Sequence, residues 1–332
     1  MSKSFGQKAK ILYILRYLEE YTDENKSITT KQILEKLAEE GITCDRKTIY
    51  SDMECLKDMG YEIDQEPTRN GGGWKLLSRE FELPELKLLV DAVQSSRFIT
   101  TKKSRELIKK IEKFTSNNEA TKLNRQVFVA SRIKAENESI FYIVDSIQTA
   151  IQENKQISFT YYEWNSKKEL VVKGAEKRVI NPWALIWKDE NYYLLAYSSE
   201  ANDARHFRVD KMRNVEILKT PRDGGDWFKK IDLSNYADST FSMMGGNVEN
   251  LSIDMPEGLV GVAIDKFGKD ITIQKLENKR IRIRVKVQKS DQLYGWLAGL
   301  GGEVVIHSPE DVRNEYIDRL KKILESHEKL GE

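Results

Sequence analysis

The stretch Asp45-Arg46-Lys47-Thr48-Ile49-Tyr50-Ser51-Asp52 decides the fold of the first part of this chain. Asp45 is a favoured residue at a helix start and Gly60 is a favoured stop, so the stretch predicts a helix between them. Three apolar residues recur inside it at helical spacing and form one inner stripe: Ile49, Met53 and Leu56. The opposite face carries Lys47, Tyr50, Ser51 and Glu54, with Arg46 on its flank.

Two more helices precede this one. A first amphipathic helix fades near Tyr21 and carries on one face Ile11, Leu12, Leu15 and Leu18. A second begins at Thr29, which has the capping-box spacing to Gln32, and stops at Gly41. Only three or four residues separate the second helix from the third, which is the spacing of a helix-turn-helix.

After Gly60 the apolar pattern changes to that of short strands. Tyr61-Glu62-Ile63 and Trp74-Lys75-Leu76 flank the turn Arg69-Asn70-Gly71-Gly72-Gly73, which predicts a hairpin. A glycine-rich hairpin behind a helix-turn-helix is a wing. We therefore expect residues 1–80 to form a winged helix-turn-helix domain.

The polarity of the third helix points to DNA. Its amino-terminal half carries cationic and hydrogen-bonding groups, whereas the acids Glu54 and Asp58 lie toward its far end. This polarity suits a helix that enters the major groove by its amino-terminal end. We expect Lys47, Tyr50 and Ser51 to reach base edges. We expect Arg46 and Arg69 to reach phosphates. The candidate DNA contacts are Arg46, Lys47, Thr48, Tyr50, Ser51 and Arg69.

The charge of this domain leaves a second interpretation open. Residues 1–80 carry nine Lys and four Arg against 15 Asp and Glu, a net charge of −2. DNA-binding domains are normally basic, so a protein-interaction module of the same fold remains an alternative. Cys44 fits a turn residue and Cys55 a small packing residue of the third helix, rather than a redox pair.

The motif from Asp45 to Asp52, with Leu56 and the Gly60-Tyr61 continuation, resembles the recognition helix of the DeoR/YafY-like winged helix-turn-helix regulators. In those proteins the residue before the final Asp is often Arg, whereas this chain has Ser51. The departure removes one expected phosphate or base contact and leaves the operator sequence open. The resemblance implies a DNA-binding transcriptional regulator.

Residues 81–155 are expected to form a helical connector. Three apolar stripes lie at helical spacing, with a turn predicted at residues 116–118: Leu86, Leu89, Val90 and Val93, then Leu107, Ile108, Ile111 and Phe114, then Ile140, Val144, Ile147 and Ile151. Such helices must pack on one another or on a second subunit. Paired half-sites require two winged helices at fixed spacing, which favours a homodimer, but an intrachain spacer remains open.

Residues 156–222 carry the pattern of a small β-barrel. Ile157, Phe159 and Tyr161 alternate with polar residues, and the apolar runs 183–187 and 192–197 flank a turn as a hairpin. This stretch resembles a WYL domain: the naming tripeptide appears as Tyr192-Tyr193-Leu194, and a downstream motif appears as Phe207-Arg208-Val209-Asp210-Lys211-Met212. The resemblance implies an Sm/SH3-like barrel that senses a nucleotide or single-stranded nucleic acid.

The ligand contacts follow from the matching positions of this resemblance. A base can stack on Tyr193 while Arg208 pairs with phosphate. The other candidate ligand contacts are Arg178, His206 and Asp210. Two alternatives remain open, because one of the adjacent tyrosines at 192 and 193 must face the core and because Arg208 can simply pair with Asp210 or Asp189.

Residues 223–332 predict a second mixed domain. Arg280, Arg282, Arg284 and Lys286 alternate with Ile281, Ile283, Val285 and Val287, which is a strand with one cationic face. A helix, a strand and a final helix from Ser308-Pro309 follow. We expect a ferredoxin-like α+β domain, and the region resembles the extension behind WYL domains. The cationic face either lines an anion-binding groove or is the solvated side of the sheet.

The whole chain is therefore expected to be a multidomain α+β protein of 332 residues. Its 54 Lys and Arg nearly balance 53 Asp and Glu, so an anionic partner must meet a local patch. The longest apolar run, residues 192–197, is far shorter than the roughly 20 residues of a membrane span. The first five residues lack the apolar core of a signal peptide, so we expect a cytoplasmic protein without disulfides or structural zinc.

The sequence favours a regulator over an enzyme. It lacks the serine elbow, the zinc-protease helix motif, the phosphate loop and the paired-cysteine motif, so we expect no catalysis and no cofactor. The function expected is a ligand-responsive regulator that binds duplex operator DNA as a homodimer and senses an anionic effector. The alternative is a nucleic-acid-sensing accessory protein that binds single strands and modulates a partner effector.

Overall fold

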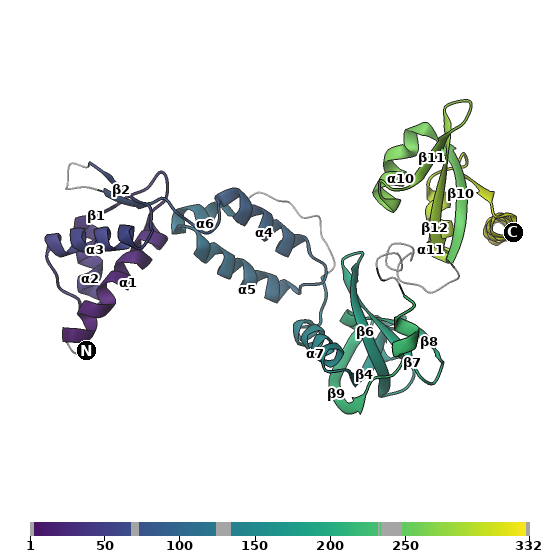
Figure 1. Ribbon diagram of the computed structural model, residues 1–332, viewed down its shortest axis with the longest axis horizontal. Helices are drawn as coiled ribbons and strands as arrows, with labels where there is room; N and C mark the ends of the chain where they lie inside the picture. The colour runs from purple at the N-terminus through teal and green to yellow at the C-terminus, as the bar shows by residue number, and fades with distance from the viewer. Residues whose placement is uncertain (1–2, 68–72, 124–133, 232, 234–247, 330–332) are drawn as a thin grey trace. The chain divides into compact units, whose positions relative to one another are not determined.

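The computed structural model describes residues 3–67, 73–123, 134–231, 233 and 248–329 (Figure 1). The chain divides into two compact units, Met1–Glu138 and Ser139–Glu332. Helices and several antiparallel sheets make a multidomain α+β protein, as expected. None of the helices in the described residues combines the length and the apolar character needed to cross a membrane.

The first unit begins with three helices and a hairpin. The elements are α1 (Lys3–Tyr21), β1 (Ile28–Thr29), α2 (Thr30–Glu39), α3 (Arg46–Asp58), β2 (Ile63–Glu66) and β3 (Gly73–Leu76). The three short strands form one sheet in the order β1-β3-β2. The predicted capping box between Thr29 and Gln32 is present, and the Asp45 side chain caps α3. Strands β2 and β3 pair as the predicted hairpin, although β2 covers Ile63–Glu66 rather than residues 61–63, and the six residues 40–45 separate α2 from α3 instead of three or four.

Trp74 on the returning strand of the hairpin anchors the core of these elements. Its ring is buried, its Nε1 donates to Thr30 Oγ1 at 3.0 Å, and its ring centroid lies 5.1 Å from that of Tyr50 in an edge-on contact. The three residues of the predicted inner stripe of α3 are all buried around it. The hairpin is thus fixed to α2 and α3 by one large side chain, whose burial stabilises the domain by several kcal/mol, on the order of 3.

The unit continues with two long helices and a short one. These are α4 (Leu83–Ser95), α5 (Thr101–Ile111), a 3-10 turn (Glu112–Phe114) and α6 (Asn117–Leu123). The turn predicted at residues 116–118 is wrong, because Ser116 opens α6: its Oγ accepts from the main-chain N of Glu119 at 3.2 Å. Ser116 Oγ also donates to Asp23 at 2.8 Å, which ties α6 to the chain that follows α1.

The second unit begins with one helix and an antiparallel sheet. Its elements are α7 (Ile140–Gln152), β4 (Lys155–Trp164), β5 (Leu170–Val172), β6 (Arg178–Lys188), β7 (Asn191–Ser198), β8 (Asp203–Arg208), a 3-10 turn (Val209–Lys211), β9 (Met212–Pro221) and α8 (Gly225–Phe228). The strand order is β5-β4-β6-β7-β8, and β9 pairs with the other edge of β4. The predicted connector, residues 81–155, includes α7, but α7 packs on β4, β6 and β9.

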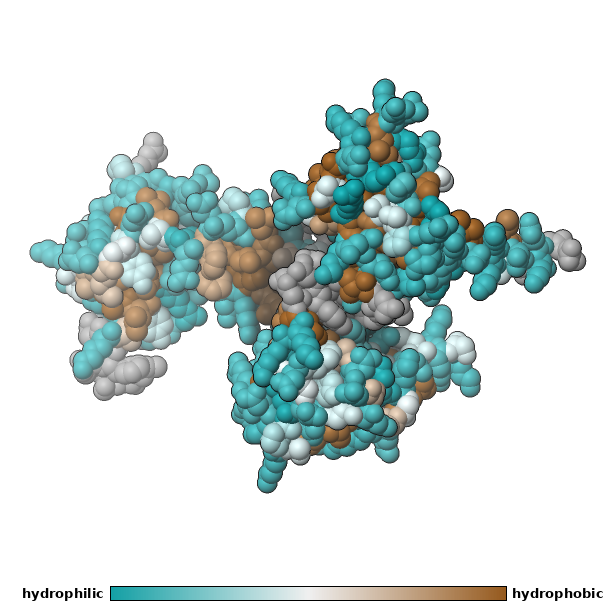
Figure 2. All heavy atoms as spheres, turned by 45° about the vertical axis from the view of Figure 1, so that its right-hand side comes forward, coloured by the Kyte–Doolittle hydropathy of each residue, from teal (hydrophilic) through white to brown (hydrophobic). Residues whose placement is uncertain are grey.

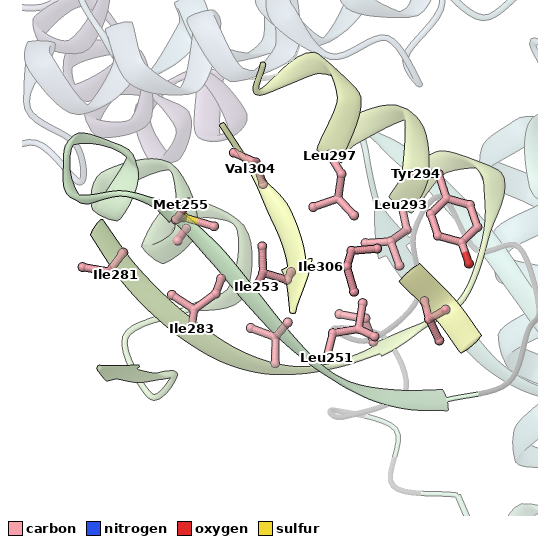
Figure 3. Packing of buried hydrophobic residues seen from close by; sticks show 14 residues of the cluster. Leu251, Ile253, Met255, Ile281, Ile283, Leu293, Tyr294, Leu297, Val304 and Ile306 are labelled. Atoms are coloured by element: carbon pink, nitrogen blue, oxygen red, sulfur yellow. The ribbon is translucent and has the colours of Figure 1, made fainter. Parts of the chain in front are cut away.

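A four-stranded sheet with helices on one face forms the last part of the chain. Its elements are β10 (Val248–Pro256), a 3-10 turn (Glu257–Leu259), α10 (Val260–Phe267), β11 (Thr272–Lys275), β12 (Arg280–Gln288), α11 (Asp291–Gly299), β13 (Val305–Ser308) and α12 (Glu310–Glu328). All neighbouring strands are antiparallel in the order β11-β12-β10-β13. Figure 3 shows the apolar side chains of the sheet between the strands and the helices, where they form one buried core.

Candidate functional sites

The leading end of α3 is locked by its own cap. The Oδ1 atom of Asp45 accepts from the main-chain N of Thr48 at 2.8 Å and from its hydroxyl at 2.7 Å. These hydrogen bonds from Thr48 hold the pKa of the Asp45 carboxyl below its ordinary value. The hydroxyl of Thr48 is therefore engaged within the helix start.

The next residues of α3 present their side chains to solvent. Arg46, Lys47 and Ser51 are exposed, and neither cation pairs with a carboxylate among the residues that the structure describes. Tyr50 differs from its prediction, because its ring is half-buried against Trp74 rather than directed away from the core. Arg69, the candidate on the wing, lies outside the described residues.

Two of the three acids of α3 are paired, and the third, Asp58, is exposed at the last residue of the helix, far from its leading end. Asp52 pairs with Lys10 of α1 at 2.9 Å, with both side chains largely buried, and Glu54 pairs with Lys57 at 3.0 Å. The unpaired cations therefore lie at the leading end of the helix, where the helix dipole is also positive. A local cationic end exists inside a domain of negative total charge.

The two cysteines do not form a site. Both are free thiols; Cys44 is half-buried, and burial raises the pKa of its thiol. Cys55 is exposed on α3, so its expected packing role is wrong. Across the described residues, no group of His, Cys, Asp and Glu side chains is arranged to hold a metal ion.

Strands β7 and β8 bring together most of the candidate ligand residues. Tyr193 lies directly opposite Arg208, and Leu195 lies directly opposite His206, so all four side chains point to the same face. The Tyr193 ring is 7% exposed and packs in a cluster with Ile186 and Leu195. Burial raises the pKa of Tyr193.

Arg208 is the best-placed cation on this face, and it already has a partner. Its Nε and Nη2 atoms donate to the two carboxylate oxygens of Asp210 at 3.0 and 2.9 Å, and Nη2 also donates to Asn191 Oδ1 at 2.9 Å. The hydrogen bond to Asp210 raises the pKa of Arg208. Its main-chain N donates to the hydroxyl of Tyr161 at 3.2 Å. Sequence patterns give no signal for Asn191, which reads as part of the turn before β7, nor for Tyr161, which is one of several alternating strand residues.

The remaining two candidates differ in environment. Burial lowers the pKa of His206 to about 4, so this side chain is neutral at pH 7. Arg178 lies with its guanidinium carbon 5.8 Å from the ring centroid of Tyr161 and 6.0 Å from that of Phe207. Because Phe207 alternates with His206 and Arg208 along β8, Arg178 contacts the other face of this strand. The structure thus groups Tyr193, His206, Arg208 and Asp210 and places Arg178 apart.

Two known families match parts of the second unit of the chain. Residues 142–217 match the WYL domain, and residues 256–324 match the WCX domain. The chain contains a WYL domain and a WCX domain. The WYL match begins in α7, a helix that lies within the predicted connector. Residues 12–68 match the D3 domain of FokI.

A known relative has a similar extent. The uncharacterized HTH-type transcriptional regulator YobV of Bacillus subtilis (strain 168) is 22% identical over 293 residues, which cover 84% of this chain and 90% of the relative. This organisation is consistent with a WYL-domain transcriptional regulator, as the resemblances in the sequence imply.

Two solved structures are also similar. Proteasome accessory factor B/C (PafBC) of Arthrobacter aurescens is 17% identical with a TM-score of 0.27; the match covers 96% of this chain, which spans 46% of the PafBC chain. A crystal structure of a CRISPR Cas-related protein is 14% identical with a TM-score of 0.37, over 99% of this chain and 86% of that chain.

Proposed function

We propose that this chain is a non-enzymatic, ligand-responsive transcriptional regulator that binds duplex DNA through residues 1–80 as a winged helix-turn-helix. The observation that carries the proposal is the leading end of α3, where Arg46 and Lys47 are exposed and have no carboxylate partner among the described residues. A helix of this polarity meets DNA by its amino-terminal end. Such a regulator acts where its DNA is, in the cytoplasm.

The candidate residues divide by role in this proposal. Lys47 and Ser51 face base edges, and Arg46 and Arg69 contact phosphates. Thr48 fixes the helix start through Asp45, and the half-buried Tyr50 sets the hairpin against α3 through Trp74. Two of the six candidates therefore act by positioning the others, and neither needs to touch a base.

A homodimer would hold two such domains at the spacing of paired half-sites. Its support is an exposed apolar face on α4, where Leu88 is 70% and Leu89 is 41% exposed. Figure 2 shows hydrophobic residues at the surface of the part of the first unit that holds α4 to α6. We assign this face to the contact between two copies.

The effector site of the proposal is the face of β7 and β8 that carries Arg208. An anion there replaces the Asp210 carboxylate as the partner of the Arg208 guanidinium, because phosphate and carboxylate accept the same pair of N–H donors. The half-buried His206 lies on the same face of β8. Arg178 lies on the opposite face of β8, against the ring of Phe207. Tyr193 is assigned to support this face, since its buried ring leaves little surface for stacking.

The finer folds follow from strand order. We assign β4 to β9 to a small Sm/SH3-like barrel, since β4 pairs along both edges. The order β11-β12-β10-β13, with a helix after β10 and another after β12, supports a ferredoxin-like domain.

The test is selection of genomic fragments by the purified full-length protein, followed by anisotropy on the enriched fragment. Lys47→Ala should weaken binding to that fragment by about tenfold to a hundredfold, which is the range for one lost base contact. The control is Lys57→Ala on the same helix, whose ammonium pairs with Glu54. No enrichment of any fragment, or equal losses for the two variants, contradicts the proposal.

A further inference from the structure

The polar face of the C-terminal sheet carries a row of cations along β12, one of its two central strands. Arg280, Arg282, Arg284 and Lys286 alternate with four buried apolar residues on β12. The apolar residues pack under the helices, so the cations lie on the opposite side of the sheet (Figure 3). Alternate residues of a strand are about 6.6 Å apart, so the row is about 20 Å long.

The charge on this face is not cancelled by the acid that lies on it. Asp254 on β10 pairs with Arg282, opposite it, through two hydrogen bonds of 2.6 and 2.8 Å, and Arg282 Nη2 also lies 3.0 Å from His307 Nδ1. Arg280 donates to the main-chain oxygen of Glu303, which leaves its charge in place. Arg284 and Lys286 are exposed and form no ion pair within the described part of the chain. Three of the four cations therefore carry uncompensated charge.

The strands on either side of the row offer hydrogen-bonding groups. Pairing places Asn250 opposite Lys286 and Ser252 opposite Arg284 on β10, and places Thr272 opposite Arg284 on β11. The described strand residues on this face include no Phe, Tyr or Trp. The face can therefore bind a polyanion that also carries hydrogen-bonding groups. It offers no aromatic ring on which bases could stack.

We propose that this face binds single-stranded nucleic acid by its phosphate backbone, independently of base sequence. A flexible single strand can lay successive phosphates along a straight row of evenly spaced cations, and guanidinium groups bind phosphate through two donors. The hydroxyl and amide groups on both sides of the row suit sugars and base edges better than the apolar anchors of an acidic peptide. This site lies on other residues than the proposed duplex and effector sites and needs neither of them.

The first test is lysine footprinting of the full-length protein with a ten-nucleotide thymidine strand at low salt. Acetylation of Lys286 should fall at least about threefold when the strand binds, whereas Lys269 and Lys322, two exposed lysines of the same domain, should react as before. Equal acetylation of Lys286 with and without the strand overturns the proposal. Equal protection by a duplex of the same length overturns the choice of a single strand, and equal protection by polyglutamate overturns the choice of nucleic acid.

The second test uses affinity and its dependence on salt. With three uncompensated cations, the logarithm of the binding constant should fall with a slope of about −2 against the logarithm of salt concentration. The double variant R284Q/K286Q should bind about tenfold or more weakly and reduce that slope by about 1.4. The double variant K269Q/K322Q removes the same charge from other surfaces of the domain and should bind as the parent does. Equal losses for the two double variants overturn the proposal.

The effects of R284Q/K286Q also separate this site from the proposed regulator function. The double variant should keep the affinity of the parent for its enriched duplex fragment, since that contact belongs to α3. Loss of Lys286 protection in a protein that still selects its operator would refute this site alone. Intact Lys286 protection in a protein that selects no fragment would refute the regulator function alone.

Discussion

The leading end of α3 and the Arg208 face of β8 both offer positive charge, and they hold it in opposite ways. Arg46 and Lys47 extend into solvent without a carboxylate partner among the described residues, while Asp52 of the same helix pairs with Lys10. Arg208 is half-buried and held by both oxygens of Asp210. The first arrangement is ready for a polyanion at any time, whereas the second binds an anion only when that anion displaces a carboxylate. A constitutive contact with DNA requires cations that are always available. A sensor requires a site that changes its state when the ligand binds.

The largest expected effect comes from His206, which lies on the same face of β8 as Arg208 and whose pKa is lowered by burial. Its folded pKa of about 4 lies below the ordinary 6.5, so the unfolded chain takes up the proton first as the pH falls. The free energy of unfolding should therefore drop by about 3 kcal/mol between pH 6.5 and pH 4 and then level off. Denaturant unfolding at several pH values should show this drop, and His206→Asn should remove it. A drop of the same size in the variant would place the titration on another group.

The attachment of α6 to the chain that follows α1 depends on Asp23. Burial raises the pKa of its carboxyl, but hydrogen bonds from Ser116, Asn118 and the main-chain N of Asn25 outweigh burial and leave the pKa below its ordinary value. Asp23→Ala should lower the free energy of unfolding by about 2 kcal/mol, because it leaves the buried Ser116 hydroxyl without its acceptor. This stabilisation is fully present above the unfolded pKa of about 3.9 and is lost as the pH falls through the lowered folded pKa. The exposed Glu39→Ala is the control in denaturant unfolding, and an equal change in both variants would contradict the role of Asp23.

Replacing Asp210, the carboxylate partner of Arg208, should leave the Arg208 guanidinium available to an anion, as Arg46 and Lys47 are at the leading end of α3. Asp210→Asn should tighten binding of a 5′-phosphorylated thymidine dinucleotide, which is too short to follow β12, by about fivefold in calorimetric titration. Asp226→Asn, on an exposed acid paired with Lys229, should leave that affinity unchanged. Weaker binding by Asp210→Asn would show that Asp210 helps to hold the ligand and does not compete with it.

The smallest effect is expected at Arg46. Because Arg46 is assigned to a phosphate, Arg46→Ala should weaken all duplex sequences alike, by about threefold, and reduce the salt slope by about 0.9. Lys47→Ala should instead act on the enriched fragment more than on random duplex. Anisotropy with both duplexes at several salt concentrations distinguishes the two roles. A sequence-dependent loss for Arg46→Ala would move Arg46 to the base edges.

Local signals carried most of the fold. The Thr29 and Gln32 pair and the Asp45 cap are short-range hydrogen bonds, and the Ile49 stripe has the period of a helix, so each is visible in a single stretch of sequence. The start of α6 cannot be predicted from its residues, because Ser116 followed by two Asn residues favours a turn as well as an N-cap. The stripe of α7 shows that one face is buried but does not show that β4, β6 and β9 cover it.

The sites are harder to predict than the helices and strands, because they depend on packing between segments and not on patterns within one stretch. Alternation shows that one of Tyr192 and Tyr193 faces inward, but only the packing of Ile186 and Leu195 decides that Tyr193 does. The Arg208–Asp210 pair was one of two open alternatives, since a separation of two residues brings side chains together only when the 3-10 turn after β8 bends the chain back. The compensation of the Asp52 charge depends on Lys10, which lies 42 positions earlier in the chain.

The most direct test of the account places a probe on α3 itself. Cys55 is exposed one turn beyond Ser51 on the same helix, so an iron-chelate reagent on Cys55, in a Cys44→Ser background, would cleave DNA that lies against this face. The account predicts cuts within the DNA segment that the protein protects, in each half-site. Full protection of a genomic fragment with no cut inside the protected segment would contradict it.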